Sequence, residues 1–360
     1  MRIRNEKKRR GTSTIKEVAK MAGVSVGTVS HVISSSVPVS ESLRRKVLAA
    51  IRTLDYHPNH IARSLKTRST RTLGIVVPDM TIPFFPQVIR SAESAARRLG
   101  YSLIAVNSDD DSARQEEVLS LLRSQRVEGV LLVVASGPGS AQQILKLTRS
   151  GIPVVCLDRL PDGVDVDSVC VDDCSAAEMG VGHLISRGHR RIAIVTGPLT
   201  LKNEQARLRG CKAALKRAGV TPDKSLVWEA KLDQQEVVRI CKQHLLTARQ
   251  RPSALFSTNG VTGLGALRGM AACGLRTPED IAFATFDELT AEDIFRPSIT
   301  SVVQPAQEIG CRAAEILIKR IQEKEGAPVS KIEIRLPATL KVRESSSRPS
   351  VAPVVALASG

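Results

Sequence analysis

Between positions 14 and 57 the apolar residues recur with the spacing of helix faces. The pattern predicts three short helices, of which the first two begin after the capping residues Thr14 and Ser25 and the third follows from Ser40, and Gly23 ends the first of them. The inner faces of these helices are expected to be formed by Ile15, Val18, Ala19, Val29, Val32, Ile33, Leu43, Val47, Leu48, Ala50, Ile51 and Leu54. Two short helices joined by a tight turn and closed by a third are typical of a helix-turn-helix domain, which we assign to residues 14–57 and call the headpiece.

From position 73 onward, short apolar runs alternate with amphipathic stretches. The runs with the composition of strands are LGIVVP, SLIAVN, VEGVLLVVA, IPVVCLD, SVCVD, RIAIVTG, SLVWEA, ALFST, IAFATFD and SITSVVQP. Alternation at this spacing is typical of parallel sheets covered by helices, so we predict a two-lobed α/β core over residues 73–343. The first lobe is expected to comprise residues 73–168 plus 304–323, and the second residues 169–303 plus 324–343, with SVCVD opening the second series of strands.

Basic side chains are concentrated at the amino end of the chain. Residues 1–71 hold sixteen lysines and arginines against four acidic residues, so three quarters of the formal net charge of +16 lies in the first fifth of the sequence. Phosphate contacts supply most of the sequence-independent affinity for DNA, and a surplus confined to one end is therefore typical of a DNA-binding module. We assign residues 1–13 to a basic arm. A targeting tail is an alternative for residues 1–10. The alternative is limited to this segment, because a targeting tail does not account for the patterned residues that follow.

Composition and motif spacing exclude several classes of protein. No apolar run approaches the roughly 18 residues that cross a bilayer, and the charged amino end lacks the apolar segment of a secretion signal, so we expect a cytoplasmic protein without a membrane partner. The seven cysteines are odd in number and lie in apolar stretches, which favours reduced thiols. Their spacing fits no zinc pattern, and we expect neither a metal nor a cofactor. The chain has no GxxxxGK[ST] loop, no GxGxxG after its first strand and no nucleophile elbow, so we predict that it is not an enzyme.

The second predicted helix carries the candidate base-reading residues. In a helix-turn-helix the first residues of this helix reach base edges in the major groove. Val26 can contact a thymine methyl group, Thr28 can bond to a base or a phosphate, and His31 can donate to guanine. Gly27 lowers helix propensity by about 1 kcal/mol, which indicates either close approach of the backbone to DNA or a tolerated weakness. The candidate DNA-contacting residues of the headpiece are Thr14, Ser25, Val26, Gly27, Thr28, Ser30 and His31.

A short segment between the headpiece and the core has helical signals of its own. Pro58 interrupts the third helix, Asn59 can cap a new one, and about two turns remain before a polar linker. An isolated helix of this length is marginally stable in water, so we expect it to form only against a partner helix or DNA. We assign residues 58–72 to this hinge helix and linker.

The headpiece and the hinge carry a family resemblance. TIKEVAKMAGVSVGTVSHV followed by HPNHIARSLK resembles the signature of the lactose-repressor/galactose-repressor family of bacterial transcription regulators, and the SLK ending is similar to its purine-repressor branch. The resemblance implies that hinge helices of two subunits pair in the minor groove, where Leu65 would wedge open the central base step beside Lys66. Ordinary packing is the alternative for Leu65. The hinge residues expected to contact DNA are Asn59, Ala62, Arg63, Leu65 and Lys66.

Polar side chains follow the carboxyl ends of the predicted strands. Ligands of open α/β sheets bind outside these ends, so residues there are expected to line a cleft between the lobes. The set consists of Asp79, Phe84, Phe85, Asn107, Asp109, Asp110, Asp111, Asp158, Arg159, Thr196, Gly197, Arg207, Asn259 and Asp287. Carboxylate, amide and guanidinium groups can form directed bonds to a sugar or a base. Taken singly, each of these residues can equally be a strand-end cap or a turn residue.

The resemblance to the same family extends over the core, from about Thr14 to Arg343. The segments that carry it are VPDMTIPFFPQVIRSAESAARRLGY, VVCLDR, RGHRRIAIVTGP, ARLRGCKAAL, PEDIAFATFDE and RPSITSVVQP, which are similar to the periplasmic-binding-protein-like domain of the family. The effector contacts that it implies are Phe84, Phe85, Asp158, Arg207, Asn259 and Asp287. We add Asp79, which follows the first strand, to the candidate effector residues. The chain departs from the family pattern at Leu232, Gly260 and Glu288, so neither lactose-like nor purine specificity transfers directly.

These observations favour a regulator with a DNA-binding headpiece and an effector-binding core. We expect a homodimeric repressor that binds double-stranded DNA at a near-palindromic operator, with an affinity controlled by a small molecule such as a sugar or a related metabolite. A corepressor-dependent or activating regulator is the alternative, and a free-standing sugar-binding protein is disfavoured by the helix-turn-helix. Residues 344–360 lack a leucine heptad and are expected to form a disordered tail, so we expect a dimer and no coiled-coil tetramer.

Overall fold

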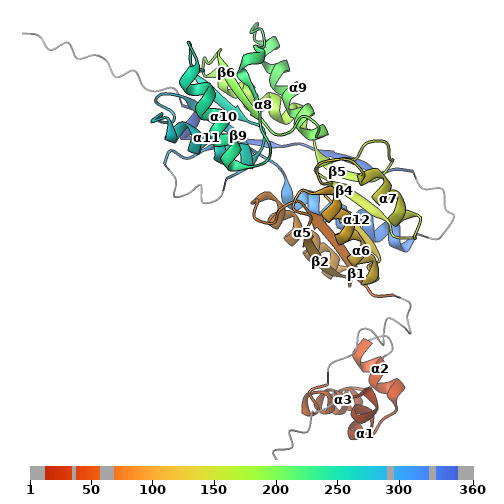
Figure 1. Ribbon diagram of the computed structural model, residues 1–360. Coiled ribbons are helices and arrows are strands. Elements are labelled where there is room, and N and C mark those ends of the chain that lie inside the picture. The colour runs from red at the N-terminus through yellow and green to blue at the C-terminus, as the bar shows by residue number, and fades with distance from the viewer. Residues whose placement is uncertain (1–12, 35–37, 57–68, 290–295, 324–329, 348–360) are drawn as a thin grey trace, which may run out of the picture. The chain divides into compact units, whose positions relative to one another are not determined.

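The computed structural model describes residues 13–34, 38–56, 69–289, 296–323 and 330–347 of the 360-residue chain. The chain divides into two compact units between Thr70 and Arg71, and each unit is described by itself (Figure 1). Among the described residues, no helix combines the length and the apolar character needed to cross a membrane. The predicted hinge helix falls within residues 57–68, which lie outside the described residues.

The described part of the first unit forms the three predicted helices, which are α1 (Ile15–Ala22), α2 (Val26–Ser34) and α3 (Glu41–Thr53). Local bonds set their ends. Thr14 begins α1 in a capping box, in which its side chain accepts from the backbone of Glu17 and the Glu17 carboxylate accepts from the backbone of Thr14. Gly23 ends α1 in the left-handed conformation at φ 64°, and the Ser25 hydroxyl accepts from the backbone N–H of Thr28 at 3.1 Å. The predicted caps at Thr14 and Ser25 are therefore confirmed.

A small apolar core joins the three helices of the headpiece. Val18, Val29 and Val47, one from each helix, are completely buried and belong to one cluster. One predicted inner residue is wrong, because Leu48 is 37% exposed. Each residue of an α-helix is rotated by about 100° from the one before it, so a helix that buries Val47 turns Leu48 toward solvent.

The second unit contains, in its described residues, two six-stranded sheets with helices on both faces (Figure 1). The first sheet has the order β11-β5-β4-β3-β1-β2, and its strands are β1 (Thr72–Val77), β2 (Ser102–Asn107), β3 (Gly129–Leu132), β4 (Val154–Leu157), β5 (Asp167–Val171) and β11 (Glu333–Leu336). One face is covered by α5 (Phe84–Arg98) and α12 (Ala306–Gln322), and the other by α6 (Ser112–Ser124) and α7 (Ser140–Thr148). Neighbouring strands are parallel, and the inner ones are fully buried runs of Val, Ile and Leu, as expected for strands covered on both faces.

The second sheet repeats this arrangement. Its order is β12-β10-β9-β8-β6-β7, and its strands are β6 (Ile192–Thr196), β7 (Val227–Glu229), β8 (Ala254–Ser257), β9 (Ala282–Phe286), β10 (Thr300–Val303) and β12 (Thr339–Lys341). One face is covered by α8 (Asp173–Ser186) and α9 (Lys202–Arg217), and the other by α10 (Gln234–Thr247) and α11 (Gly260–Ala272), while a short 3-10 helix, η1 (Lys224–Leu226), precedes β7. Only β12 runs antiparallel to its neighbour among the described strands of this sheet.

Within the described residues the chain passes between the sheets at three places, which are β5 to α8, β10 to α12, and β11 to β12. Two strands therefore lie in the other lobe from the one that the sequence predicted. β5 pairs with β4, with Cys156 opposite Ser168, and β11 pairs with β5, so both belong to the first sheet. The predicted boundary at residue 168 and the assignment of the β11 residues to the second lobe are corrected accordingly, because an apolar run does not reveal which strand it pairs with. β12 lies in the second sheet, as predicted.

The beginning of the predicted disordered tail is ordered. A 3-10 helix, η2 (Glu344–Ser346), follows β12, and its Ser345 and Ser346 are fully buried. The Ser345 hydroxyl donates to the carbonyl oxygen of Phe283 at 2.8 Å and accepts from the backbone N–H of Thr300 at 2.8 Å, so it ties the segment to β9 and β10. The prediction of a tail from residue 344 is wrong at these positions, and residues 348–360 lie outside the described part of the chain.

Candidate functional site

The second helix of the headpiece has a buried side and an exposed side. Val29 and Val32 are buried in the headpiece core, whereas Val26, Gly27 and His31 are exposed. Thr28 and Ser30 are half-buried between these two sides, and the capping residues Thr14 and Ser25 are exposed. The structure therefore brings all of the predicted DNA-contacting residues of α2 to the start or the outer face of that helix.

Two of these residues are held in place by each other. The hydroxyl oxygens of Ser25 and Thr28 are 3.0 Å apart, so the side chain of Thr28 is oriented by the helix cap. Gly27 is not required by the packing of the headpiece, because a β-carbon at this position would lie 3.6 Å from the Ser25 hydroxyl, an ordinary contact distance. A glycine here leaves the start of α2 open to an approaching backbone.

The predicted DNA contacts of the hinge lie outside the part of the chain that the structure describes. Asn59, Ala62, Arg63, Leu65 and Lys66, which the resemblance implies as minor-groove contacts, lie outside the described residues. They stay predictions.

A cleft of about 1100 Å³ opens between the two lobes of the second unit, where strands of both sheets end. We call it the outer cleft. It adjoins a deep pocket of about 30 Å³, and the two share lining residues such as Ile82 and Arg159. Six of the seven predicted effector residues line the deep pocket, namely Phe84, Phe85, Asp158, Arg207, Asn259 and Asp287. The seventh, Asp79, lines the outer cleft, where its carboxylate accepts from the backbone N–H of Thr81 at 2.7 Å.

Arg207 is the centre of the deep pocket. It reaches from α9 of the second lobe and is only 2% exposed. Its Nε donates to Asp173 Oδ1 at 2.7 Å, its Nη1 donates to the carbonyl oxygen of Thr258 at 2.9 Å, and its Nη2 lies 3.4 Å from Asp158 Oδ1 of the first lobe. The guanidinium also stacks 3.8 Å above the ring of Phe286. A single side chain therefore bonds to both lobes at the floor of the cleft.

The carboxylates around Arg207 are held in an environment that disfavours their charge. Asp158 and Asp287 each follow a strand directly and adopt left-handed backbone angles, φ 57° and φ 70°, which turn the chain at the cleft. Burial raises the pKa of both carboxyl groups above their ordinary value, and the attraction of Arg207 opposes this shift. Burial likewise raises the pKa of Asp173 to about 7, with the negative charge of Asp158 adding to the effect. Burial, which disfavours the charge of these carboxyl groups, and Arg207, which favours it, therefore oppose each other throughout the cluster.

Asn259 caps α11 and at the same time lines the deep pocket. Its side-chain oxygen accepts from the backbone N–H of Thr262 at 2.9 Å, which is the strand-end cap that the sequence left as an alternative. Its Nδ2 donates to Glu204 Oε1 at 2.9 Å, and the other Glu204 oxygen accepts from Thr196 and Gly197. The amide of Asn259 is thus fixed by two directed bonds.

Two aromatic rings and one leucine form the apolar part of the pocket wall. Phe84 and Phe85, at the start of α5, are buried and meet edge to face, with ring centroids 5.2 Å apart. Leu232 lines both the deep pocket and the outer cleft. The departure from the family pattern at this position therefore falls on the ligand-facing wall, where it places an aliphatic side chain.

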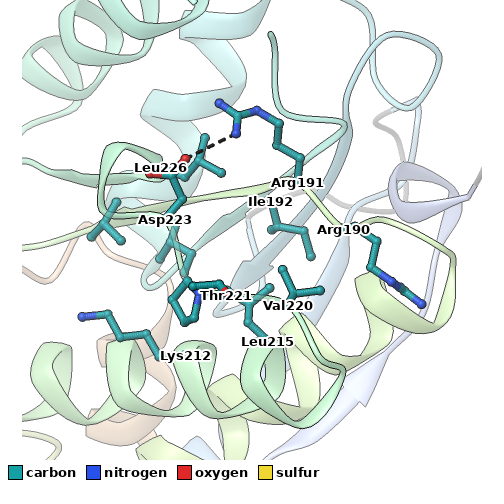
Figure 2. Close-up of a pocket in the computed structure, with 12 residues that line it drawn as sticks. Arg190, Arg191, Ile192, Lys212, Leu215, Val220, Thr221, Asp223 and Leu226 are labelled. Atoms are coloured by element: carbon teal, nitrogen blue, oxygen red, sulfur yellow. Dashed lines mark hydrogen bonds and ion pairs between the residues drawn. The ribbon is translucent and has the colours of Figure 1, made fainter.

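A separate pocket of about 280 Å³ lies at the amino end of β6 (Figure 2). Its floor is apolar, and Arg191 at its rim pairs with Asp223, with Nη1 3.3 Å from Oδ2. Arg190 donates to the carbonyl oxygen of Ile185 at 2.8 Å, and Figure 2 shows its guanidinium pointing away from Asp223. Because ligands of open α/β sheets bind at the carboxyl ends of strands, the cleft is the better candidate for the effector site.

Two family models match the chain, one for each unit. Residues 14–59 match bacterial regulatory proteins of the lacI family, and residues 70–340 match periplasmic binding proteins and the sugar-binding domain of the LacI family. The chain belongs to the lacI family of bacterial regulatory proteins. The resemblance and the fold class inferred from the sequence are thereby confirmed for this lacI-family chain.

Several relatives are similar over almost their whole length. The HTH-type transcriptional repressor PurR of Haemophilus influenzae (strain PittEE) is 34% identical over 335 residues, which are 92% of this chain and 98% of the relative. A solved complex of the transcriptional regulator CelR with cellobiose is 32% identical with a TM-score of 0.69, and covers 92% of this chain and 99% of its own. The lac repressor dimer bound to operator and the anti-inducer ONPF is 25% identical with a TM-score of 0.79, and covers 94% and 100%. These relatives are regulators, not enzymes.

Sequence reasoning left several lining residues of the pocket unassigned in this lacI-family chain, among them the polar residues Arg159, Asn203, Glu204 and Gln304. Arg159 was noted at a strand end without being assigned to the effector, and Glu204 and Gln304 were not singled out. The strand-end rule already placed Arg159 at the cleft, and it could also have found Gln304, which directly follows β10. Glu204 lies in the first turn of α9 and carries no sequence signal that separates it from an exposed helical glutamate.

Proposed function

We propose that the protein is a repressor that binds operator DNA through its headpiece and a small hydroxylated molecule in the cleft of its core. One observation carries the proposal: a single chain joins an exposed α2 face, in the most basic part of the sequence, to a cleft whose floor draws Asp158 and Arg207 from different lobes. Neither half alone would couple a metabolite to a gene. The proposal also assigns the protein to the cytoplasm, where bacterial DNA lies.

The charges of the deep pocket favour an uncharged effector. Arg207 is already paired with Asp173 and Asp158. Two further buried acidic residues, Glu204 and Asp287, line the pocket. A phosphate or carboxylate placed there would face several buried carboxyl groups of like sign. Relatives support a sugar: CelR was solved with cellobiose, and a regulator from Enterococcus faecium, 28% identical with a TM-score of 0.67, was solved with bound ribose.

The first lobe offers a surface for a second copy of the chain. β2 is an edge strand of the first sheet, and its Ile104 is 37% exposed, while Leu99 at the end of α5 is 46% exposed. An open strand edge with apolar side chains favours association with another chain. A dimer built there would present two headpieces related by two-fold symmetry, and a near-palindromic operator with half-sites about one helical turn apart follows from it.

The coupling between ligand and DNA is proposed to run through the relative positions of the lobes. A molecule that bonds to side chains of both lobes favours one arrangement of the lobes over another and so changes the affinity of the protein for its operator. By linkage, operator DNA changes the affinity of the protein for that molecule by the same factor. A ligand that favours the operator-binding arrangement acts as a corepressor, and one that favours the other acts as an inducer. The sign of regulation is therefore the direction in which the ligand moves operator affinity.

The DNA half of the proposal is tested by selecting duplexes from a random pool with the full-length protein. We expect an inverted repeat to be enriched. His31→Ala is expected to lose most of this preference while it binds random duplex DNA as well as the parent does, because His31 lies on the base-reading face of α2. Enrichment of a single unpaired half-site, or no enrichment at any salt concentration, would contradict the proposal.

The ligand half is tested by thermal stabilisation of the full-length protein with sugars, sugar phosphates and nucleobases. A ligand that binds the native state raises the melting temperature by mass action. We expect an uncharged sugar to stabilise the protein and to change operator affinity. Stabilisation by sugar phosphates alone would contradict the inferred charge preference, and stabilisation without any change in operator affinity would contradict the coupling.

A further inference from the structure

Two buried polar atoms of the deep pocket have no hydrogen-bond partner among the described residues. They are Nε of Arg159 and Oε1 of Gln304, and each residue is only 6% exposed. A buried donor or acceptor without a partner is costly, and native proteins retain such groups where a ligand or a solvent molecule can satisfy them. Both atoms therefore point to a bonding requirement that the chain itself does not meet.

The position of Arg159 is fixed through its Nη1 atom. Its Nη1 donates to Asp110 Oδ1 at 2.5 Å and to the carbonyl oxygen of Val134 at 3.3 Å. Asp110 is itself held by the backbone N–H and the hydroxyl of Ser136, at 3.0 and 2.8 Å. The Nε atom lies 3.9 Å from Asp158 Oδ2, which is too long for a hydrogen bond. The guanidinium is thus held through Nη1, and its buried Nε is left without a hydrogen bond.

The orientation of the Gln304 amide is fixed in the same way. Its Nε2 donates to Asp287 Oδ1 at 2.7 Å, and the other Asp287 oxygen accepts from the backbone N–H of Gly260 at 3.3 Å, so the carboxyl group acts as an acceptor and the amide nitrogen faces it. The remaining oxygen, Oε1, is then a buried acceptor without a partner, on a residue that lines the pocket. Gln304 follows β10 of the second sheet, whereas Arg159 follows β4 of the first. The two unbonded atoms therefore come from different lobes.

We propose that Arg159 and Gln304 form the specificity-determining pair of the cleft: an uncharged effector accepts a hydrogen bond from Arg159 Nε and donates one to Gln304 Oε1, and so bridges the lobes. The inference rests on the proposed function and names what that function must recognise. A hydroxyl group is both donor and acceptor, so a hydroxylated end of a sugar meets both requirements. A phosphate or a carboxylate has no proton to give Gln304 at neutral pH and would face Asp158 and Asp287.

The volumes of the deep pocket and the outer cleft indicate which part of the ligand each of them can hold. The deep pocket, at about 30 Å³, is far smaller than the outer cleft, so it receives one end of a ligand rather than the whole molecule. The outer cleft of about 1100 Å³ accommodates the rest of the molecule. Selection by hydrogen bonding is thus confined to the hydroxylated end of the effector, and the outer cleft tolerates variation in the remainder.

The test measures calorimetric affinities of the full-length protein for glucose, galactose, ribose and cellobiose, for glucose 6-phosphate, and for the monodeoxy derivatives of the sugar that binds. Arg159→Lys keeps a positive charge beside Asp110 but removes Nε, and Gln304→Leu removes Oε1. We expect each variant to bind the sugar about five- to tenfold more weakly. Arg191→Lys, which keeps its charge beside Asp223 in the remote pocket of Figure 2, is the matched control and is expected to bind within twofold of the parent.

Changing the residue and the ligand hydroxyl together shows whether Arg159 and Gln304 bond to the ligand or only support the structure of the pocket. Removing the hydroxyl that contacts the pair should weaken binding by the parent about five- to tenfold but should cost Arg159→Lys or Gln304→Leu little more, because the bond is already lost. Melting temperatures and ligand-free operator binding show whether the variants fold. Additive losses at every deoxy position, or variant affinities equal to that of the parent, would overturn the inference. If no sugar binds the parent at all, the proposed function itself fails.

Discussion

Asp158 of the first lobe and Arg207 of the second meet at the floor of the cleft, with Arg207 Nη2 3.4 Å from Asp158 Oδ1. Both side chains are almost completely buried, at 7% and 2% exposure. Breaking a buried pair by removal of one partner is costly because it leaves the other charge uncompensated, by about 3–5 kcal/mol. Variants at this site must therefore preserve shape if they are to report on function rather than on folding.

Asp158→Asn is expected to weaken effector binding at least about tenfold and to leave operator binding unchanged. Asparagine tolerates the left-handed angle of φ 57° and keeps the shape of the side chain. It removes the negative charge by which Asp158 of the first lobe attracts Arg207 of the second lobe. The headpiece belongs to the other compact unit. Fluorescence anisotropy with labelled operator, titrated with and without the sugar, measures both quantities. Asp162→Asn, in the same loop but 84% exposed, is the control, and an equal effect there would contradict the assignment.

The Asp173 carboxyl is expected to make the free energy of unfolding decrease as pH rises from about 4 to 7. Its pKa is raised from an ordinary 3.8 to about 7 by burial, so in this window the folded chain holds a proton that the unfolded chain releases, and folding is favoured by acid. The contribution is of the order of a few kcal/mol over the window. Urea denaturation at several pH values checks this, with Asp173→Asn expected to have the flatter profile. Parallel profiles would show that another group titrates.

Ile104→Lys is expected to convert the dimer into a monomer of 38.8 kDa and to reduce operator affinity strongly. A charge on the exposed edge strand β2 would have to be desolvated in the interface, and one headpiece alone contacts one half-site. Sedimentation velocity measures the mass. Leu246→Lys, at a leucine of α10 that is 61% exposed, should leave the mass unchanged, and a dimer that survives the Ile104 change would place the interface elsewhere.

Gly210→Ala is expected to destabilise the core by several kcal/mol, because α8 and α9 cross too closely for a side chain. A β-carbon on Gly210 would lie 2.0 Å from the backbone carbonyl oxygen of Cys174, which cannot move away cheaply. The control is Gly182→Ala in α8, where no described atom outside that helix's own backbone would lie within 4 Å of the new carbon. It should be neutral or stabilising by up to about 1 kcal/mol, since alanine favours helix. Urea denaturation that ranks the two variants in the opposite order would refute the close crossing.

Features that depend on local chemistry could be predicted from the sequence. The caps at Thr14 and Ser25 and the stop at Gly23 involve bonds within four residues, so the sequence around them is sufficient. The alternation of strands and helices gave the two-lobed architecture for the same reason. The exposure of Leu48 was missed because an apolar residue at a helical spacing is consistent with two neighbouring faces, and only packing decides between them.

Features that depend on distant pairing could not be predicted. β5 and β11 are apolar runs whose partners lie elsewhere in the chain, and nothing in their own residues names the sheet. The strand-end rule brought Asp158, Asn259 and Asp287 together correctly at the deep pocket. It did not show that Arg159 and Gln304 would each keep an unbonded polar atom there, since satisfaction of hydrogen bonds is a property of the whole fold.

Because the described chain crosses between the sheets three times, neither lobe is a continuous stretch of sequence, and no single recombination event can exchange one lobe for that of another regulator. The headpiece is continuous and is joined at one junction near Thr70. Gene shuffling can therefore reassign this sensor to a new operator in one step, whereas a new ligand has to be acquired by substitutions inside the cleft.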